Sequence, residues 1–207
     1  MLIKLYEQNI DERQVKKIVY CLKNGGVIIY PTDTVYAFGC DLYNKKAIER
    51  ISKLKFLPEN SDKYTLICEN LSHLSDFCAQ ISNPTFKVMK RLLPGAFTFI
   101  LKANTEVPKL FRSNKKTVGI RVPDNAIAQK IVQELGNPLV SSSLFNADDD
   151  IEEYLTDPEL IYEKYNHLVD MVIDGGFGNN EPSTILDCTA DEGEIVVVRQ
   201  GKGVFIA

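Results

Sequence analysis

The segment Gly25–Gly39 reads GGVIIYPTDTVYAFG, and it decides the fold class. Its apolar run Val27–Tyr30 meets a proline and then opens into hydroxyl groups around one carboxylate, Asp33. Open α/β sheets build ligand sites in this way, at the carboxyl ends of their strands. If the segment after the proline stays extended, Thr32, Thr34 and Tyr36 share one face. The alternative is a strand-exit loop whose threonine and aspartate side chains cap backbone donors, and the residues leave both readings open.

Outward from this segment, helical and strand patterns alternate along the chain. The predicted helix caps are Asp11, Asn44, Asn83 and Asp124. The helix after Asn83 is expected to turn Phe86, Met89 and Leu93 toward the core. Strands are predicted at residues 27–30, 65–68, 97–101, 118–121, 139–143, 168–173, 184–186 and 195–199. This interleaving predicts one α/β domain over residues 1–207, with helices packed on a twisted, mostly open mixed sheet.

Composition and motifs exclude several classes of protein. The chain has 207 residues, of which 44% are hydrophobic, and no apolar run long enough for a transmembrane helix is expected. The N-terminus lacks a signal-peptide pattern, and the five cysteines are scattered without a CxxC motif, so buried free thiols in the cytoplasm are expected. The two histidines fit no metal or triad pattern, and no Walker A loop or dinucleotide fingerprint occurs.

Charge is spread unevenly, although the net charge is only −4. Basic residues predominate between positions 84 and 135, and acidic residues between 146 and 195. The asymmetry favours an electropositive surface for phosphates or RNA, and two ordinary solvated faces are the alternative. The predicted RNA contacts are Lys87, Lys90, Arg91, Lys115 and Lys116.

Polar side chains also lie at the ends of several other predicted strands. The two-residue period puts Thr117, Gly119 and Arg121 on one face, with the glycine leaving room for a ligand. Ser141 and Ser143 likewise share a face. Ser183 precedes one strand, and Arg199 ends another. An arginine fork suits carboxylate or phosphate, so the sequence predicts a polar hollow that binds an anion.

Five motifs make the sequence resemble the YrdC/YciO family over residues 10–201. They read YPTDTVYAFGCD (30–41), LPGAFTFIL (93–101), TVGIRVPDN (117–125), PLVSSS (138–143), and PSTILD with VVVRQG near the end. The resemblance implies a YrdC/RibB-like fold, with a positively charged concave surface that is associated with nucleotide and with double-stranded RNA or tRNA.

The best-understood members of this family are threonylcarbamoyl-AMP synthases. They combine L-threonine, bicarbonate and ATP with magnesium, for the modification of an adenosine in tRNA. The predicted substrate contacts are Thr32, Thr34, Arg121 and Ser183, and the predicted nucleotide contacts are Thr117, Ser141, Ser143 and Arg199. Lys55 and Arg121 are the predicted catalytic residues, and no metal ligand is predicted among the protein side chains.

The chain departs from the synthase pattern at three positions. Leu57 replaces the arginine of a Lys-x-Arg pair that begins at Lys55, and Phe145 stands where asparagine is expected. Glu69 stands where a histidine helps to hold threonine, and a glutamate there would repel a carboxylate. These differences resemble the YciO branch. Three hypotheses follow: a nucleotide- and RNA-binding protein with weak or absent synthase chemistry, an active synthase with a rearranged site, and a non-catalytic RNA-binding module.

Overall fold

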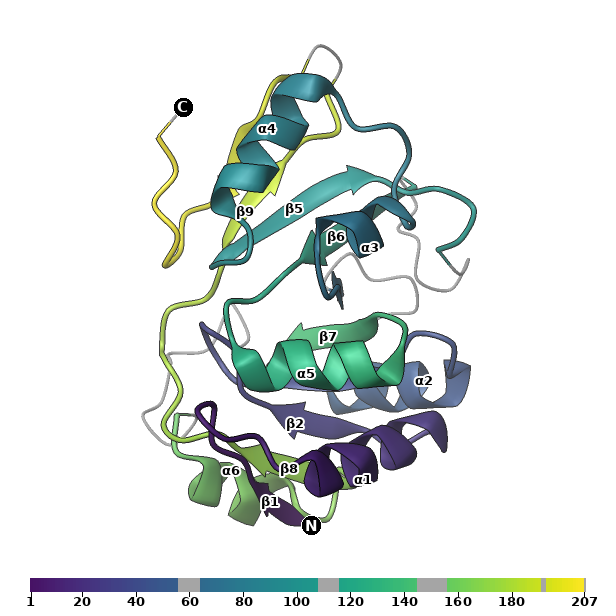
Figure 1. The fold of residues 1–207 in the computed structure, drawn as a ribbon, viewed down its shortest axis with the longest axis vertical. Helices are drawn as coiled ribbons and strands as arrows, with labels where there is room; N and C mark the ends of the chain where they lie inside the picture. Colours follow the sequence, from purple (N-terminus) through teal and green to yellow (C-terminus); the bar gives the residue numbers. More distant parts are fainter. Residues whose placement is uncertain (56–63, 108–115, 145–155, 191–192, 207) are drawn as a thin grey trace.

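A computed structural model describes residues 1–55, 64–107, 116–144, 156–190 and 193–206 of the chain. Within them lies one sheet of ten strands in the order β1-β8-β2-β3-β7-β4-β6-β5-β9-β10 (Figure 1). The strands are β1 (Leu2–Lys4), β2 (Ile28–Tyr30), β3 (Ala37–Asp41), β4 (Thr65–Ile67), β5 (Phe97–Lys102), β6 (Thr117–Arg121), β7 (Leu139–Ser143), β8 (Met171–Asp174), β9 (Thr184–Asp187) and β10 (Val196–Arg199). The helices are α1 (Glu12–Lys23), α2 (Lys45–Leu54), α3 (Leu71–Ser75), α4 (Asn83–Leu92), α5 (Ala126–Leu135) and α6 (Pro158–Tyr165).

The sheet is mixed and open, which confirms the predicted fold class. Parallel pairs join β1 to β8, β8 to β2, β4 to β6 and β5 to β9, and the other neighbours are antiparallel. The described strands β1 and β10 form the two edges. Parallel and antiparallel neighbours are mixed along the sheet, and segments far apart in the sequence, such as β1 and β8, lie side by side (Figure 1).

The two faces of the sheet are covered differently. One face, here called the core face, packs against α2, α3, α4 and α6 in the larger hydrophobic cluster. The other face packs against α1 and α5 near β1, β8, β2 and β3. In β6, Val118 and Ile120 belong to the core face, so Gly119 and Arg121 point to the opposite one. That opposite face is called the cavity face below.

Two of the four predicted helix caps are confirmed. Asp11 accepts a hydrogen bond from the backbone N of Arg13 at 2.8 Å. Asn44 accepts one from the backbone N of Ala47 at 3.1 Å. Both side chains therefore satisfy a backbone donor that the first helical turn leaves unpaired.

The other two predicted caps are wrong by one residue. Ser82, rather than Asn83, caps α4, and Asn125, rather than Asp124, caps α5. Met89 and Leu93 are buried as expected, whereas Phe86 is 39% exposed. Thr85 takes the inward place that the sequence pattern assigned to Phe86.

Several further elements were not predicted, or differ from the prediction. The sequence pattern missed β1, β3, α3 and α6. β8 begins at Met171 rather than at residue 168, because the backbone N of Leu168 bonds to the carbonyl of Tyr165 and closes α6. The segment 32–36 forms a bend rather than an extended strand. All five cysteines are free thiols, and within the described ranges no helix is long and apolar enough to cross a membrane.

Candidate functional site

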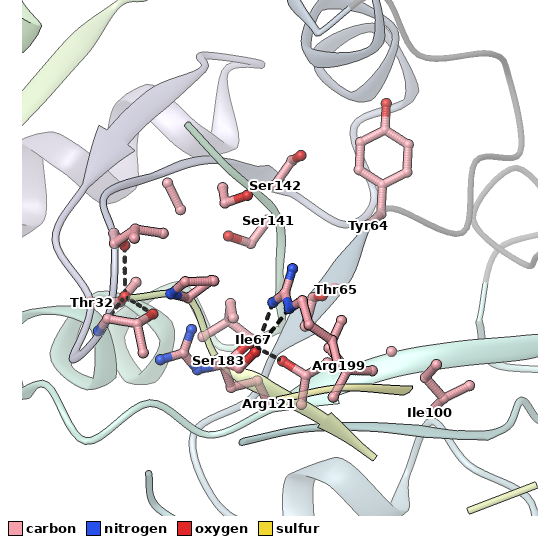
Figure 2. Close-up of a pocket in the computed structure, with 18 of the residues that line it drawn as sticks. Thr32, Tyr64, Thr65, Ile67, Ile100, Arg121, Ser141, Ser142, Ser183 and Arg199 are labelled. Carbon is pink, nitrogen blue, oxygen red and sulfur yellow. Dashed lines mark hydrogen bonds between the residues drawn. The ribbon is translucent and has the colours of Figure 1, made fainter. Parts of the chain in front are cut away.

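A cavity of about 320 Å³ opens on the cavity face, over the middle of the sheet (Figure 2). Its floor is a row of residues in register across four strands: Ser141, Thr65, Gly119 and Ile100. A side chain at Gly119 would project into this space, with its Cβ 3.2 Å from the carbonyl oxygen of Tyr64. The glycine therefore keeps this part of the cavity floor open.

Two arginines line the cavity from β6 and β10. Arg121 is only 7% exposed and forms an ion pair with Asp33 through its Nη2. Arg199 donates to the carbonyl of Ser183 from Nη2 at 2.7 Å and from Nε at 3.3 Å (Figure 2). Burial, and secondarily the charge of Arg121, lower the pKa of Arg199 from its ordinary value. Two guanidinium groups thus share one partly desolvated space, which favours an anion between them.

The hydroxyl groups of the 32–36 bend are connected to each other. Thr32 Oγ1 donates to the carbonyl of Val35 at 2.8 Å and accepts from the backbone N of Thr34 at 3.1 Å. Because its proton is used in this way, the 3.0 Å contact between the two threonine hydroxyls makes Thr34 the donor to Thr32. Thr32 is then fully bonded within the protein, whereas the hydroxyl of Thr34, which is fully buried in the cavity wall, keeps an unused acceptor. Tyr36 leaves the predicted row and donates instead to the carbonyl of Gly176 at 2.7 Å.

Serine and lysine groups complete the polar lining. Ser141 donates to the carbonyl of Phe38 at 3.1 Å and lies 2.8 Å from the buried hydroxyl of Tyr30. Burial raises the pKa of Tyr30 to about 12, so this phenol stays neutral and serves as a donor to Ser141. Lys55 Nζ donates to the carbonyl of Ser143 at 2.6 Å, which brings an ammonium group to the cavity wall.

The structure brings most of the sequence-predicted residues together in this one cavity, although their roles stay predictions. The predicted site residues that line it are Thr32, Thr34, Lys55, Arg121, Ser141, Ser143, Ser183 and Arg199. Thr117 does not line it, because it pairs with Lys102 at the end of β6 that lies away from Arg121. Sequence reasoning missed Thr98, whose hydroxyl lies 2.8 Å from that of Ser183. The alternation of side chains along β5 could have revealed it. Because Phe97 and Phe99 point to the core face, Thr98 between them must point to the cavity face.

The chain departs from the synthase pattern at Leu57, Glu69 and Phe145, and of these only Glu69 is among the described residues. Glu69 does not line the cavity, and its carboxylate accepts from Gln133 at 3.4 Å near the surface. The expected repulsion of a bound carboxylate therefore has no geometric basis at Glu69. Leu57 and Phe145 lie outside the described residues.

The described residues among the predicted RNA contacts do not line the cavity. Lys87, Lys90 and Arg91 are on α4, which packs on the core face through Met89. Lys116 immediately precedes β6, and Lys115 lies outside the described residues. Across the described part of the chain, no group of three or more His, Cys, Asp or Glu side chains could hold a metal ion. Magnesium with ATP therefore stays a prediction from the resemblance.

The fold and the cavity define a class of protein: an open mixed α/β sheet with an anion-receptive hollow on one face. The chain belongs to the Sua5/YciO/YrdC family, because the family model described as telomere recombination matches residues 20–201. It is 40% identical over 200 residues to the uncharacterized protein YciO of Escherichia coli K12, covering 96% of this chain and 94% of that protein.

Other relatives and solved structures agree with this assignment. The threonylcarbamoyl-AMP synthase of Pseudoalteromonas translucida is 29% identical over 180 residues, which cover 86% of this chain and 94% of that enzyme. The crystal structure of E. coli YciO matches with a TM-score of 0.89 over 99% of this chain and 97% of that one. The structure of P. abyssi Sua5 complexed with L-threonine matches with a TM-score of 0.86 at 24% identity, over 97% of this chain and 57% of that one, which shows a shared fold.

Proposed function

We propose that this protein binds an adenine nucleotide together with a small carboxylic acid, and that it carries out threonylcarbamoyl-AMP synthesis weakly or not at all. The observation that carries the proposal is the convergence of Arg121, Arg199 and Lys55 on one cavity. Three cations beside one paired carboxylate leave an excess of positive charge, which suits phosphate and carboxylate groups.

The relatives support the choice of ligands. A relative in the same family is named as a synthase of threonylcarbamoyl-AMP, an adenine nucleotide derivative, and the P. abyssi Sua5 structure is described as a complex with L-threonine. A cavity of about 320 Å³ is at the lower end of the usual size for small-molecule sites. L-threonine and part of a nucleotide fit that size, with the rest of the nucleotide toward the open side.

The weak chemistry follows from two sequence positions. Leucine at position 57 cannot neutralise a phosphate, and phenylalanine at position 145 cannot donate the hydrogen bond of an asparagine. Losing one charge-assisted contact to a transition state costs about 2–4 kcal/mol, which is roughly thirtyfold to a thousandfold in rate. Among the described residues, Lys55 is the lysine that lines the cavity, and it supplies one half of the Lys-x-Arg pair expected of the synthases.

Calorimetric titration with ATP and with L-threonine tests binding, and pyrophosphate release in the presence of bicarbonate tests chemistry. Arg199→Ala is expected to weaken ATP binding by about tenfold to a hundredfold, because a desolvated charged donor is lost. Arg13→Ala, at an exposed position in the first turn of α1, is the matched control and should bind ATP like the wild type.

Two results would contradict the proposal in different ways. If the wild-type protein does not bind ATP, the proposed nucleotide site is refuted. Rapid threonine-dependent pyrophosphate release, abolished by Arg121→Ala, would instead make the protein an active synthase in tRNA modification.

The proposal extends to double-stranded RNA or tRNA. Lys87, Lys90 and Arg91 form an exposed basic set on α4, and RNA backbones attract such sets. Because α4 packs on the core face, RNA bound there would leave the cavity accessible to small molecules.

A further inference from the structure

The guanidinium of Arg121 is incompletely bonded although it is almost fully buried. Its Nη2 donates to Asp33, but its Nε is buried and has no hydrogen-bond partner among the described residues. Buried polar groups are nearly always paired, so an unpaired N–H on a side chain that is 7% exposed marks the place of a missing acceptor. Arg121 lines the cavity, which makes a ligand anion the natural acceptor.

Asp33 differs from the other polar residues of the bend in its relation to the cavity. Thr32, Thr34 and Val35 line the cavity, but Asp33 does not. Its carboxylate accepts a hydrogen bond from Nη2 of the guanidinium. The protein therefore holds one nitrogen of the planar guanidinium, while Nε has no partner among the described residues.

The backbone of Asp33 is itself held by two distant segments. Lys202 Nζ, from the segment after β10, donates to the carbonyl of Asp33 at 2.6 Å. Asn179, from the loop after β8, donates to the same carbonyl from Nδ2 at 3.4 Å, and its backbone N donates to the carbonyl of Thr34 at 3.0 Å. A carboxylate anchored in this way can fix the angle of the side chain it binds.

We propose that Asp33 is a positioning residue that holds the guanidinium of Arg121 with its Nε edge toward the ligand anion. The inference rests on the proposed function, because it needs an anionic ligand in the cavity. Asp33 contributes a fixed hydrogen-bond acceptor rather than a favourable charge. Its negative charge by itself would oppose the binding of an anion. Removal of Asp33 should therefore strengthen ATP binding if its charge dominates, and weaken ATP binding if its positioning of Arg121 dominates.

The test compares Asp33→Asn with Asp33→Ala, which remove the same charge but differ in whether an acceptor remains. ATP affinity is measured by calorimetry, and the Nε–H signal of Arg121 is followed by NMR on isotope-labelled protein. Asp33→Asn should keep a restricted Nε–H signal and an ATP affinity within about threefold of the wild type. Asp33→Ala should lose that restriction and weaken ATP binding by about tenfold, the size of one charge-assisted hydrogen bond.

Controls separate positioning from general damage. Asp170→Ala removes another arginine-paired carboxylate, which contacts Arg50 at 2.8 Å and does not line the cavity, and should leave both readouts unchanged. Thermal unfolding checks that each variant is folded. If Asp33→Ala does not fold, Asp33→Ser takes its place, because its short hydroxyl cannot span the distance to Arg121.

The outcomes distinguish this inference from the proposed function. Tighter ATP binding by both Asp33→Asn and Asp33→Ala would overturn the inference and make Asp33 a competing anion. Unchanged affinity and an unchanged Nε–H signal in Asp33→Ala would overturn it as well. In both cases the wild type still binds ATP and the proposed function stands, whereas absence of wild-type binding would overturn the two together.

Discussion

At the scale of single residues, Thr32 and Thr34 look equivalent in the sequence but differ in the structure. Both line the cavity, yet the hydroxyl of Thr32 is consumed by Thr34 and by the carbonyl of Val35. Thr32 therefore maintains the bend, whereas the hydroxyl of Thr34, which is fully buried, keeps an unused acceptor. The direction of the hydrogen bonds, rather than the residue type, distinguishes the two threonines.

This difference predicts that Thr32→Val is destabilising. Valine keeps the shape but leaves the buried backbone N of Thr34 and carbonyl of Val35 without their partner. The free energy of unfolding, measured with urea, is expected to fall by about 1–3 kcal/mol. Thr105→Val, at an exposed position, should change it by less than about 0.5 kcal/mol. Equal stability of Thr32→Val and the wild type would refute the scaffold role.

At the scale of elements, the start of α5 shows how neighbouring capping residues can be distinguished. The sequence motif places Asp124 and Asn125 side by side, and both residue types are good caps. In the structure Asn125 Oδ1 accepts from the backbone N of Ala128 at 2.9 Å, while its Nδ2 donates to Glu7. Asp124 is exposed. The helix that covers the cavity face therefore depends on the second residue of the pair.

We expect Asn125→Ala to lower the free energy of unfolding by about 1–2 kcal/mol, because the first turn of α5 loses its cap. Asp124→Ala is the matched variant and should cost less than about 0.5 kcal/mol. Urea unfolding followed by circular dichroism measures both. A larger loss in Asp124→Ala than in Asn125→Ala would mean that the helix begins one residue earlier.

At the scale of the whole molecule, the sheet separates two charged regions. The cavity lies on one face, and the basic residues of α4 belong to a helix packed on the other. A single sheet therefore carries the cavity on one face and the basic residues of α4 on the other, with no shared residues. Their separation predicts that the two kinds of binding are independent.

The combined variant Lys87→Glu, Lys90→Glu and Arg91→Glu should weaken binding of a duplex RNA by more than about tenfold at low salt, and it should reduce the dependence of the affinity on salt. ATP affinity should stay within about twofold of the wild type, because those side chains lie on the opposite face. Electrophoretic mobility shift assays at several salt concentrations measure the RNA affinity and its dependence on salt. Unchanged RNA affinity would place any RNA contact elsewhere on the molecule.

Much of the fold could be predicted from the sequence because periodicity is a local property. The α1 stripe of Val15, Ile18, Val19 and Leu22 is buried as expected, and so is the α5 stripe from Ile127 to Leu135. β3 was missed because five consecutive buried residues, Ala37–Asp41, show no polar alternation. A strand in the interior of the sheet, covered on both faces, has little periodicity to detect.

The family, the mixed α/β class and the set of polar strand ends could be predicted from the sequence, because each depends on local order and spacing. Which of those ends meet is known only from the three-dimensional fold, since β4, β6, β7 and β10 become neighbours of one cavity through the strand order. It also decided that Asp33 binds Arg121 across 88 positions of the chain, that Thr117 lies outside the cavity, and that the α4 cations lie on the other face. Contacts of that kind depend on long-range packing, which no local pattern encodes.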